Sequence, residues 1–198
     1  MTVMTGLVGN QKQKNHDFVG DCVVGTKSLV GFPHYEEFLA TLNRMDEVEG
    51  AAPVVKNYAV IRVENDTQSD DVEIMGIDPV CQSKVTSFAG SLHYRRDDPA
   101  RAFEPAYDAN LPGLVLGVYL ALGRADERQF SLGSKPPRIA VLLTCVPLTR
   151  TGAPAGTTTG IPSQRFYYSD FSQSGLPRVD GGTVYIPLEK AQALCFAG

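Results

Sequence analysis

The segment Ile139 to Val146 constrains the fold of this chain more than any other. Its eight residues are mostly β-branched or otherwise apolar, and Pro137 and Pro147 bound it. A short, continuous apolar segment between such breakers is typical of a strand that is buried on both faces. We therefore expect Ile139 to Val146 to form a buried strand of a sheet.

Two neighbouring segments form a predicted β-hairpin. Pro53 to Glu64 alternates in polarity and is rich in β-branched residues, and Val72 to Ile77 returns after a polar turn. Asp78-Pro79 ends the second strand, because proline has no N–H to donate to a sheet. The other predicted strands are Asp21 to Val24, Gly113 to Gly117, Arg165 to Phe171 and Thr183 to Ile186.

The clearest predicted helix runs from His34 to Val48. Its apolar side chains recur at helical spacing and form one stripe, which we expect to pack on the core. The stripe consists of Tyr35, Phe38, Leu39, Leu42, Met45 and Val48. Further helical segments are expected at residues 1–14, around Leu120 and Leu122, at Leu188 to Phe196, and as fragments between Cys81 and Asn110.

The order of these elements predicts the fold class. Helices and strands follow one another without a regular βαβ rhythm, which favours an α+β fold with a mixed sheet and packed helices over a doubly wound sheet. At 198 residues, 43% of them hydrophobic, the chain can bury a real core as one domain or as two joined subdomains. The net charge of −4 argues against nucleic acid as a partner, because binding phosphates needs a basic face.

The cysteines and histidines give no metal or cofactor pattern. The four cysteines form no CxxC pair, so we predict no zinc site and no cofactor. They are Cys22, Cys81, Cys145 and Cys195. One or two disulfides remain open, and four cysteines allow three full pairings. Cys145 lies within a buried-strand pattern and is most simply a small core residue. The histidines His16, His34 and His93 fall in separate polar segments and are expected at the surface.

Two pairs of adjacent carboxylates support an alternative function. Asp70-Asp71 and Asp97-Asp98 suit solvated turns, because neighbouring side chains on a strand point apart. An acid–base pair of the glycosidase type would need the fold to bring these carboxylates together. That alternative makes the protein a small soluble extracytoplasmic hydrolase or carbohydrate-active enzyme.

One long loop and the aromatic segment after it indicate a binding role. Leu148 to Arg165 is a connection of eighteen residues rich in Thr, Gly, Pro and Ala, and loops of this length are commonly functional. In the segment that follows, Phe166 and Tyr168 should face one side of the strand, and Tyr167 and Phe171 the other. We expect a long β-hairpin whose aromatic base turns one face to the core. The other face is either a surface for a partner or is covered by a second packed layer. The predicted partner-binding residues are Thr151, Pro154, Ile161, Pro162, Gln164, Arg165, Phe166 and Tyr168.

Several segments, in order, resemble one family. They are similar to segments of ABC-transporter permeases of the FtsX-like, MacB-like and lipoprotein-releasing kinds. The most specific is Gly160 to Phe166, which resembles the segment after the hairpin that lipoprotein-releasing permeases use to engage a periplasmic carrier. The others are Val3 to Leu7, Val48 to Pro53, Met75 to Pro79, Leu114 to Ala121 and Val184 to Leu194.

The resemblance implies a location, a role and a set of partners. Residues 1–14 would be the remnant of a first membrane helix and its exit segment. Residues 15–198 would be a MacB-like periplasmic core domain on the extracytoplasmic side of the inner membrane, truncated at its C-terminal end. Its role would be non-catalytic binding and coupling. The implied partners are a cytoplasmic ATP-binding subunit, a second permease copy or homologue, and an extracytoplasmic carrier or lipoprotein. A full-length version would carry four membrane helices, with this domain between the first and the second.

Overall fold

The computed structural model describes residues 13, 14, 16–26, 31, 34–64, 66–123, 133–149 and 161–196. Residues 13 and 14 are helical, and the rest of the predicted helix at 1–14 lies outside the described residues. The segment Asp21 to Val24, predicted as a strand, is irregular. Its four residues are exposed, so no neighbouring strand or core holds them in a sheet.

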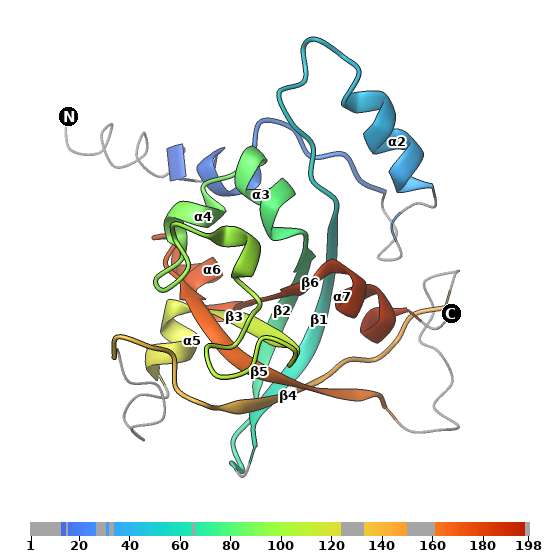
Figure 1. Ribbon diagram of the computed structural model, residues 1–198. Helices are drawn as coiled ribbons and strands as arrows, with labels where there is room; N and C mark the ends of the chain where they lie inside the picture. Colours follow the sequence, from blue (N-terminus) through green and yellow to red (C-terminus); the bar gives the residue numbers. More distant parts are fainter. Residues whose placement is uncertain are drawn as a thin grey trace, which may run out of the picture.

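Six strands form a closed barrel in the order β1-β2-β6-β3-β5-β4 (Figure 1). The β2–β6 and β3–β5 pairs are parallel and the other pairs are antiparallel. The mixed sheet with several packed helices is confirmed, but its closure into a barrel was not predicted. The strands are β1 (Val54–Val63), β2 (Asp70–Ile77), β3 (Gly113–Gly117), β4 (Ala140–Thr144), β5 (Ser163–Ser172) and β6 (Thr183–Pro187).

The main core fills the inside of the barrel. Alternate residues of β1 point inward, so that Ala59, Ile61 and Val63 are buried while the residues between them are exposed. Helix α7 (Leu188–Cys195) adds Ala191, Leu194 and Cys195 to the same cluster. The predicted C-terminal helix is therefore confirmed, and it completes the core of the barrel.

A second core lies outside the barrel, against β2, β6 and β3. It consists of Ile77, Phe88, Leu92, Ala102, Val115 and Tyr185, and the rings of Phe88 and Tyr185 lie 5.2 Å apart. The helices over this face are short, as expected for the region from Cys81 to Asn110. They are α3 (Pro79–Val85), α4 (Phe88–Ser91), the 3-10 helix η1 (Pro99–Arg101) and α6 (Pro177–Gly182), with α5 (Val118–Gly123) beside α6.

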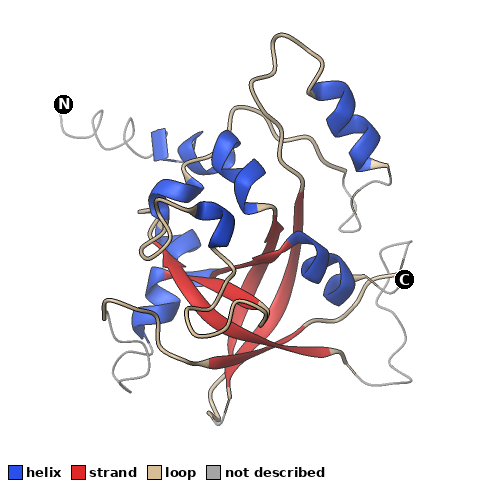
Figure 2. Ribbon diagram, in the orientation of Figure 1, coloured by secondary structure: helices blue, strands red, loops and turns tan. Residues whose placement is uncertain are grey.

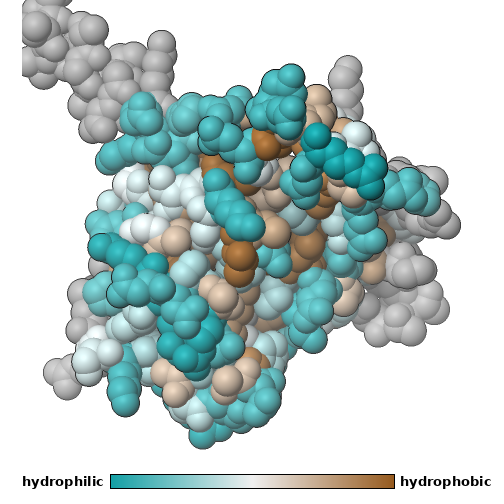
Figure 3. All heavy atoms as spheres, turned by 45° about the horizontal axis from the view of Figure 1, so that its top comes forward, coloured by the Kyte–Doolittle hydropathy of each residue, from teal (hydrophilic) through white to brown (hydrophobic). Residues whose placement is uncertain are grey.

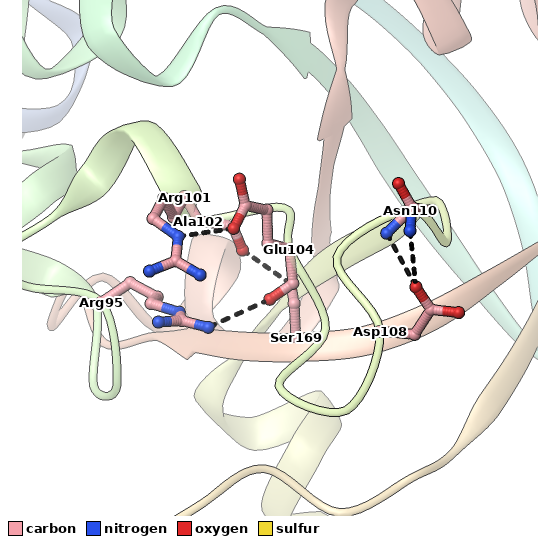
Figure 4. A network of polar contacts seen from close by, with 7 residues as sticks. All are labelled: Arg95, Arg101, Ala102, Glu104, Asp108, Asn110 and Ser169. Carbon is pink, nitrogen blue, oxygen red and sulfur yellow. Dashed lines mark hydrogen bonds and ion pairs between the residues drawn. The ribbon is translucent and has the colours of Figure 1, made fainter.

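Polar side chains of β5 hold the loops of this covered half in place. Ser169 Oγ lies 2.7 Å from the carbonyl oxygen of Ala102 (Figure 4). It lies equally close to the carbonyl oxygen of Leu114, at 2.7 Å, and can donate its hydrogen to either. The buried carboxylate of Asp170 accepts hydrogen bonds from four backbone N–H groups, those of residues 93, 94, 95 and 171. These bonds fasten the segment before η1 to the barrel.

A β-bulge at Ser169 changes which way the end of β5 faces. The register of β3 against β5 passes from Tyr168 to Asp170 between consecutive residues of β3, so that Ser169 is the extra residue. As a result, Phe171 joins Phe166 and Tyr168 in the main core. The prediction that Phe171 shares a face with Tyr167 was wrong, because regular alternation does not continue through a bulge.

The predicted core stripe of the first long helix is not buried. Helix α2 (Tyr35–Leu42) is shorter than predicted, has no buried residue, and leaves Met45 beyond its end 46% exposed. Since the remaining stripe residues are only half-buried, α2 lies against the molecule rather than in its core. Apolar residues form a band bordered by hydrophilic ones on the face that is viewed from above α2 and α3 (Figure 3).

Candidate docking surface

The outer face of β1, β4 and β5 is the open half of the barrel. In Figure 2, none of the described helices covers β4 or the adjoining part of β5. Tyr58 and Val60 project outward from β1 and are 59% and 40% exposed. Exposed aromatic and branched apolar side chains on an uncovered sheet are features of surfaces that contact partners. We refer to the outer face of β4, with the parts of β1 around Tyr58 and Val60 and of β5 from Ser163 to Tyr167, as the open face. The rest of β5 lies under the loops that Ser169 and Asp170 hold.

The antiparallel pairing of the two predicted hairpin strands is confirmed, and residues 150–160 of the connection lie outside the described residues. Strands β4 and β5 pair antiparallel, from Ala140 opposite Tyr167 to Thr144 opposite Ser163, and residues 145–162 connect them. The beginning of this connection is held to the molecule, because Leu148 is buried and its N–H donates to the carbonyl of Cys195 at 2.9 Å. The loop is therefore anchored to the core at Leu148.

The predicted partner-binding residues fall into three groups. Ile161, Pro162 and Arg165 are exposed, and Gln164 is half-buried. Phe166 and Tyr168 are buried in the main core, at 0% and 2% exposure. The remaining two, Thr151 and Pro154, lie outside the described residues.

Two of those predictions need correction. Phe166 and Tyr168 point into the barrel because they occupy the inward-facing positions of β5, so they cannot offer a docking surface in this structure. Their place on the open face is taken by Tyr58 and Val60, which the sequence analysis missed. The signal was present, since β1 carries apolar residues at its outward positions as well as at its inward ones.

A cavity of about 680 Å³ lies where β4 begins, at the border of the open face. Arg165 Nη2 is 2.5 Å from Glu64 Oε1, and both side chains are substantially exposed. The guanidinium of Arg138 lies 5.0 Å from the centre of the Tyr107 ring, which in turn meets the Tyr167 ring edge to face. Partial burial raises the pKa of Tyr107, while Arg138 acts in the opposite direction. Arginine and tyrosine together are enriched where proteins bind other proteins.

A smaller cavity, of about 350 Å³, lies between β2, β6 and α6. Lys56 forms an ion pair with Glu73 inside it. Burial lowers the pKa of Lys56, and the nearby charge of Arg178 lowers it further. Two of the charged side chains that line this cavity therefore pair with each other.

The carboxylates and histidines are not brought together. Asp70-Asp71 and Asp97-Asp98 are exposed, and neither pair lines either cavity. His16, His34 and His93 are exposed, as expected. Within the described part of the chain, no group of three or more His, Cys, Asp or Glu residues could hold a metal ion.

The buried acids have structural partners. The carboxylate of Asp170 accepts hydrogen bonds from four backbone N–H groups, as described above. The carboxylate of Asp180 accepts hydrogen bonds from the N–H and hydroxyl groups of Ser174 and from the N–H of Gly175. Burial raises the pKa of Asp170, while its backbone donors oppose that rise. Both carboxylates therefore serve to fix loops around the barrel.

None of the described helices combines the length and the hydropathy that crossing a membrane requires. Comparison with known proteins gives no family for this chain, since no protein-family model matches it and no curated protein does.

Proposed function

We propose that this chain is the extracytoplasmic binding and coupling module of an ABC-transporter permease of the lipoprotein-releasing kind. The fold would then be that of a MacB-like periplasmic core domain, and the protein would have no catalytic residues of its own. One observation carries the proposal: β4 and β5 pair as the two strands of a hairpin on a part of the barrel that no described helix covers. The ordered resemblance of sequence segments to this family supports it.

The open face suits contact through side chains. Every strand of the closed barrel pairs with a neighbour on each side, so free sheet edge is limited to stretches where one of the two pairings is absent. Contacts would come from outward side chains such as Tyr58, Val60 and Arg165, together with the hairpin connection. In the described registers, backbone pairing with a partner remains available at Ser163 to Phe166, which pair with β4 but not with β3, and beyond Thr144 and Ser163, where β4 and β5 end.

The barrel also suits the coupling role. A continuous hydrogen-bonded barrel filled by one apolar core resists deformation. If one end of the barrel is displaced, strands β4 and β5 therefore move with it as one rigid body. In this scheme a separate cytoplasmic subunit hydrolyses ATP, and membrane helices pass the movement to this domain. A carrier protein or lipoprotein on the open face would receive it.

The test uses the full-length gene product in its native membranes. We expect it to purify with an ATP-binding subunit and to drive ATP-dependent release of membrane-bound lipoproteins. A variant lacking residues 151–159 should keep the subunit and its ATPase activity but lose release. Purification without an ATPase, accompanied by hydrolysis of glycosides or esters, would contradict the proposal and favour the alternative enzyme.

A further inference from the structure

Two buried cysteines lie in contact at the point where the hairpin connection meets the C-terminal helix. Cys145 follows β4 directly, and Cys195 is the last residue of α7. Their Sγ atoms are 3.8 Å apart, and the two side chains are 1% and 0% exposed. The chain segments are also joined by a backbone hydrogen bond from Leu148 to Cys195.

We propose that Cys145 and Cys195 are a disulfide site, which closes when the protein meets an oxidant that itself carries a disulfide. A disulfide needs its sulfurs about 2 Å apart, so they must approach by roughly 1.8 Å, a movement within reach of small side-chain rotations. The other two cysteines have different surroundings. Cys22 is exposed in the irregular segment before α2, and Cys81 is half-buried near the start of α3.

The reaction is a pair of thiol–disulfide exchanges. The thiolate of one cysteine attacks a sulfur of the oxidant, forms a mixed disulfide and releases one thiol. The second cysteine, after losing its proton, attacks the protein sulfur of that mixed disulfide and releases the second thiol. The two cysteines are oxidised by two electrons, and the oxidant disulfide is reduced to two thiols.

The burial of the two sulfurs determines when the disulfide between Cys145 and Cys195 can form. The contact with Cys145, and then burial, raise the pKa of Cys195, while the side chain of Asn57 acts in the opposite direction. Because both sulfurs are shielded from solvent, oxidation of the folded protein requires local opening of the α7 end, or else takes place during folding. We expect oxidation to be slow in the native state and faster in mild denaturant.

The bond would tie the start of the hairpin connection to the helix that completes the core of the barrel. It would link cysteines 50 positions apart, enclosing β5, α6, β6 and most of α7. Restricting the unfolded chain in this way should raise the thermal midpoint by roughly 5–15 °C. The inference rests on the geometry of the pair alone and does not depend on the proposed transport role.

The experiment uses a Cys22→Ser/Cys81→Ser variant, which keeps the buried pair intact. The purified protein is exposed to glutathione disulfide in mild denaturant, refolded, alkylated and digested with trypsin. Trypsin separates the two cysteines into residues 139–150 and 191–198. We expect these two peptides to be linked, and the thermal midpoint to rise and then return when dithiothreitol is added.

The wild-type chain and a Cys145→Ala variant complete the design. The wild-type chain should give the same linked peptides in preference to links through Cys22 or Cys81. The thermal midpoint of Cys145→Ala should not change on oxidation. If Cys145→Ala fails to fold, the Cys22→Ser/Cys81→Ser variant decides alone. Two alkylated thiols with an unchanged midpoint in that variant would overturn the proposal, as would a wild-type protein cross-linked mainly through Cys22 or Cys81.

Discussion

The two halves of the barrel differ in what covers them. The outer face of β2, β6 and β3 is buried under short helices and holds a second apolar core around Phe88 and Tyr185. The face of β1, β4 and β5 leaves Tyr58 and Val60 exposed and carries the long hairpin. Since both halves belong to one closed barrel, the difference lies in the segments that pack on them. The covered half supplies stability, and the open half is free to contact another molecule.

The largest difference between the halves should appear when an aromatic ring is removed. Phe88→Ala deletes a ring that is 1% exposed, and its unfolding free energy should fall by about 3–5 kcal/mol. Tyr58→Ala, on the open face, should change it by less than about 0.5 kcal/mol, because that ring is already in water. Urea denaturation of both variants measures the contrast. Similar losses in the two variants would show that the open face is not free.

Glycine substitutions in the covered half, at Gly113 on β3 and Gly90 on α4, give the next test. A Cβ at Gly113 would lie 2.2 Å from the carbonyl oxygen of Phe103, so a rigid backbone segment has to move. Gly113→Ala should therefore cost about 1–3 kcal/mol, the usual range for overpacking. Gly90→Ala, whose added Cβ meets nothing within 4 Å, is the matched control and should be neutral or mildly stabilising. A neutral Gly113→Ala would mean that the segment at Phe103 is held loosely.

Asp170 should give the covered half a pH dependence of its own. Burial raises its pKa in the folded state, so between its ordinary pKa and that raised value the folded protein binds more protons than the unfolded chain. The contribution of Asp170 to stability is therefore greatest below its ordinary pKa, and it is lost as the pH rises through the raised one. Denaturation of wild type and Asp170→Asn from pH 3 upward measures the difference.

The expected result is that the wild type loses stability relative to Asp170→Asn as the pH rises through this window. The opposite slope would mean that the four backbone donors outweigh burial at this carboxylate.

The smallest stability effects should come from the open half. Arg165→Ala removes an exposed ion pair with Glu64 and should cost no more than about 1 kcal/mol. Deleting residues 151–159 should leave the thermal midpoint nearly unchanged, since Leu148 and its bond to Cys195 remain. Both changes should impair transport in the intact assembly. Scanning calorimetry and a transport assay on the same variants separate the two effects, and a large midpoint loss would place the loop in the packed structure.

Local patterns in the sequence predicted most of the secondary structure. Alternation and proline boundaries predicted the positions of β1, β2 and β4 nearly as observed, because these signals act within a few residues. The expected burial of β4 on both faces was wrong, since alternate residues of β4 are only half-buried. Closure of the barrel depends on pairing between strands that are distant in sequence, such as β1 with β4, and no local pattern encodes it. The stripe of α2 shows the same limit, since its spacing predicts a helix but not what the helix contacts.

The candidate site was predicted only in part. The hairpin and the exposed Arg165 followed from loop length and composition. The inward direction of Phe166 and Tyr168 required knowing which face of β5 lines the barrel, and the burial of Phe171 required the bulge at Ser169. The contact between Cys145 and Cys195 arises from tertiary packing, so spacing alone left all three disulfide pairings open.

Site-specific photo-crosslinking tests the central claim most directly. Tyr58 on the open face and Tyr119 on α5 are the same residue type with matched exposure, 59% and 55%. Each is replaced in turn by a photoreactive phenylalanine in the full-length protein, and its native membranes are irradiated. We expect position 58 to form a discrete cross-link to a carrier or lipoprotein, lost when residues 151–159 are deleted, and position 119 to form none. Equal cross-linking at both positions, or a product at position 119 alone, would contradict the claim that the open half is the functional surface.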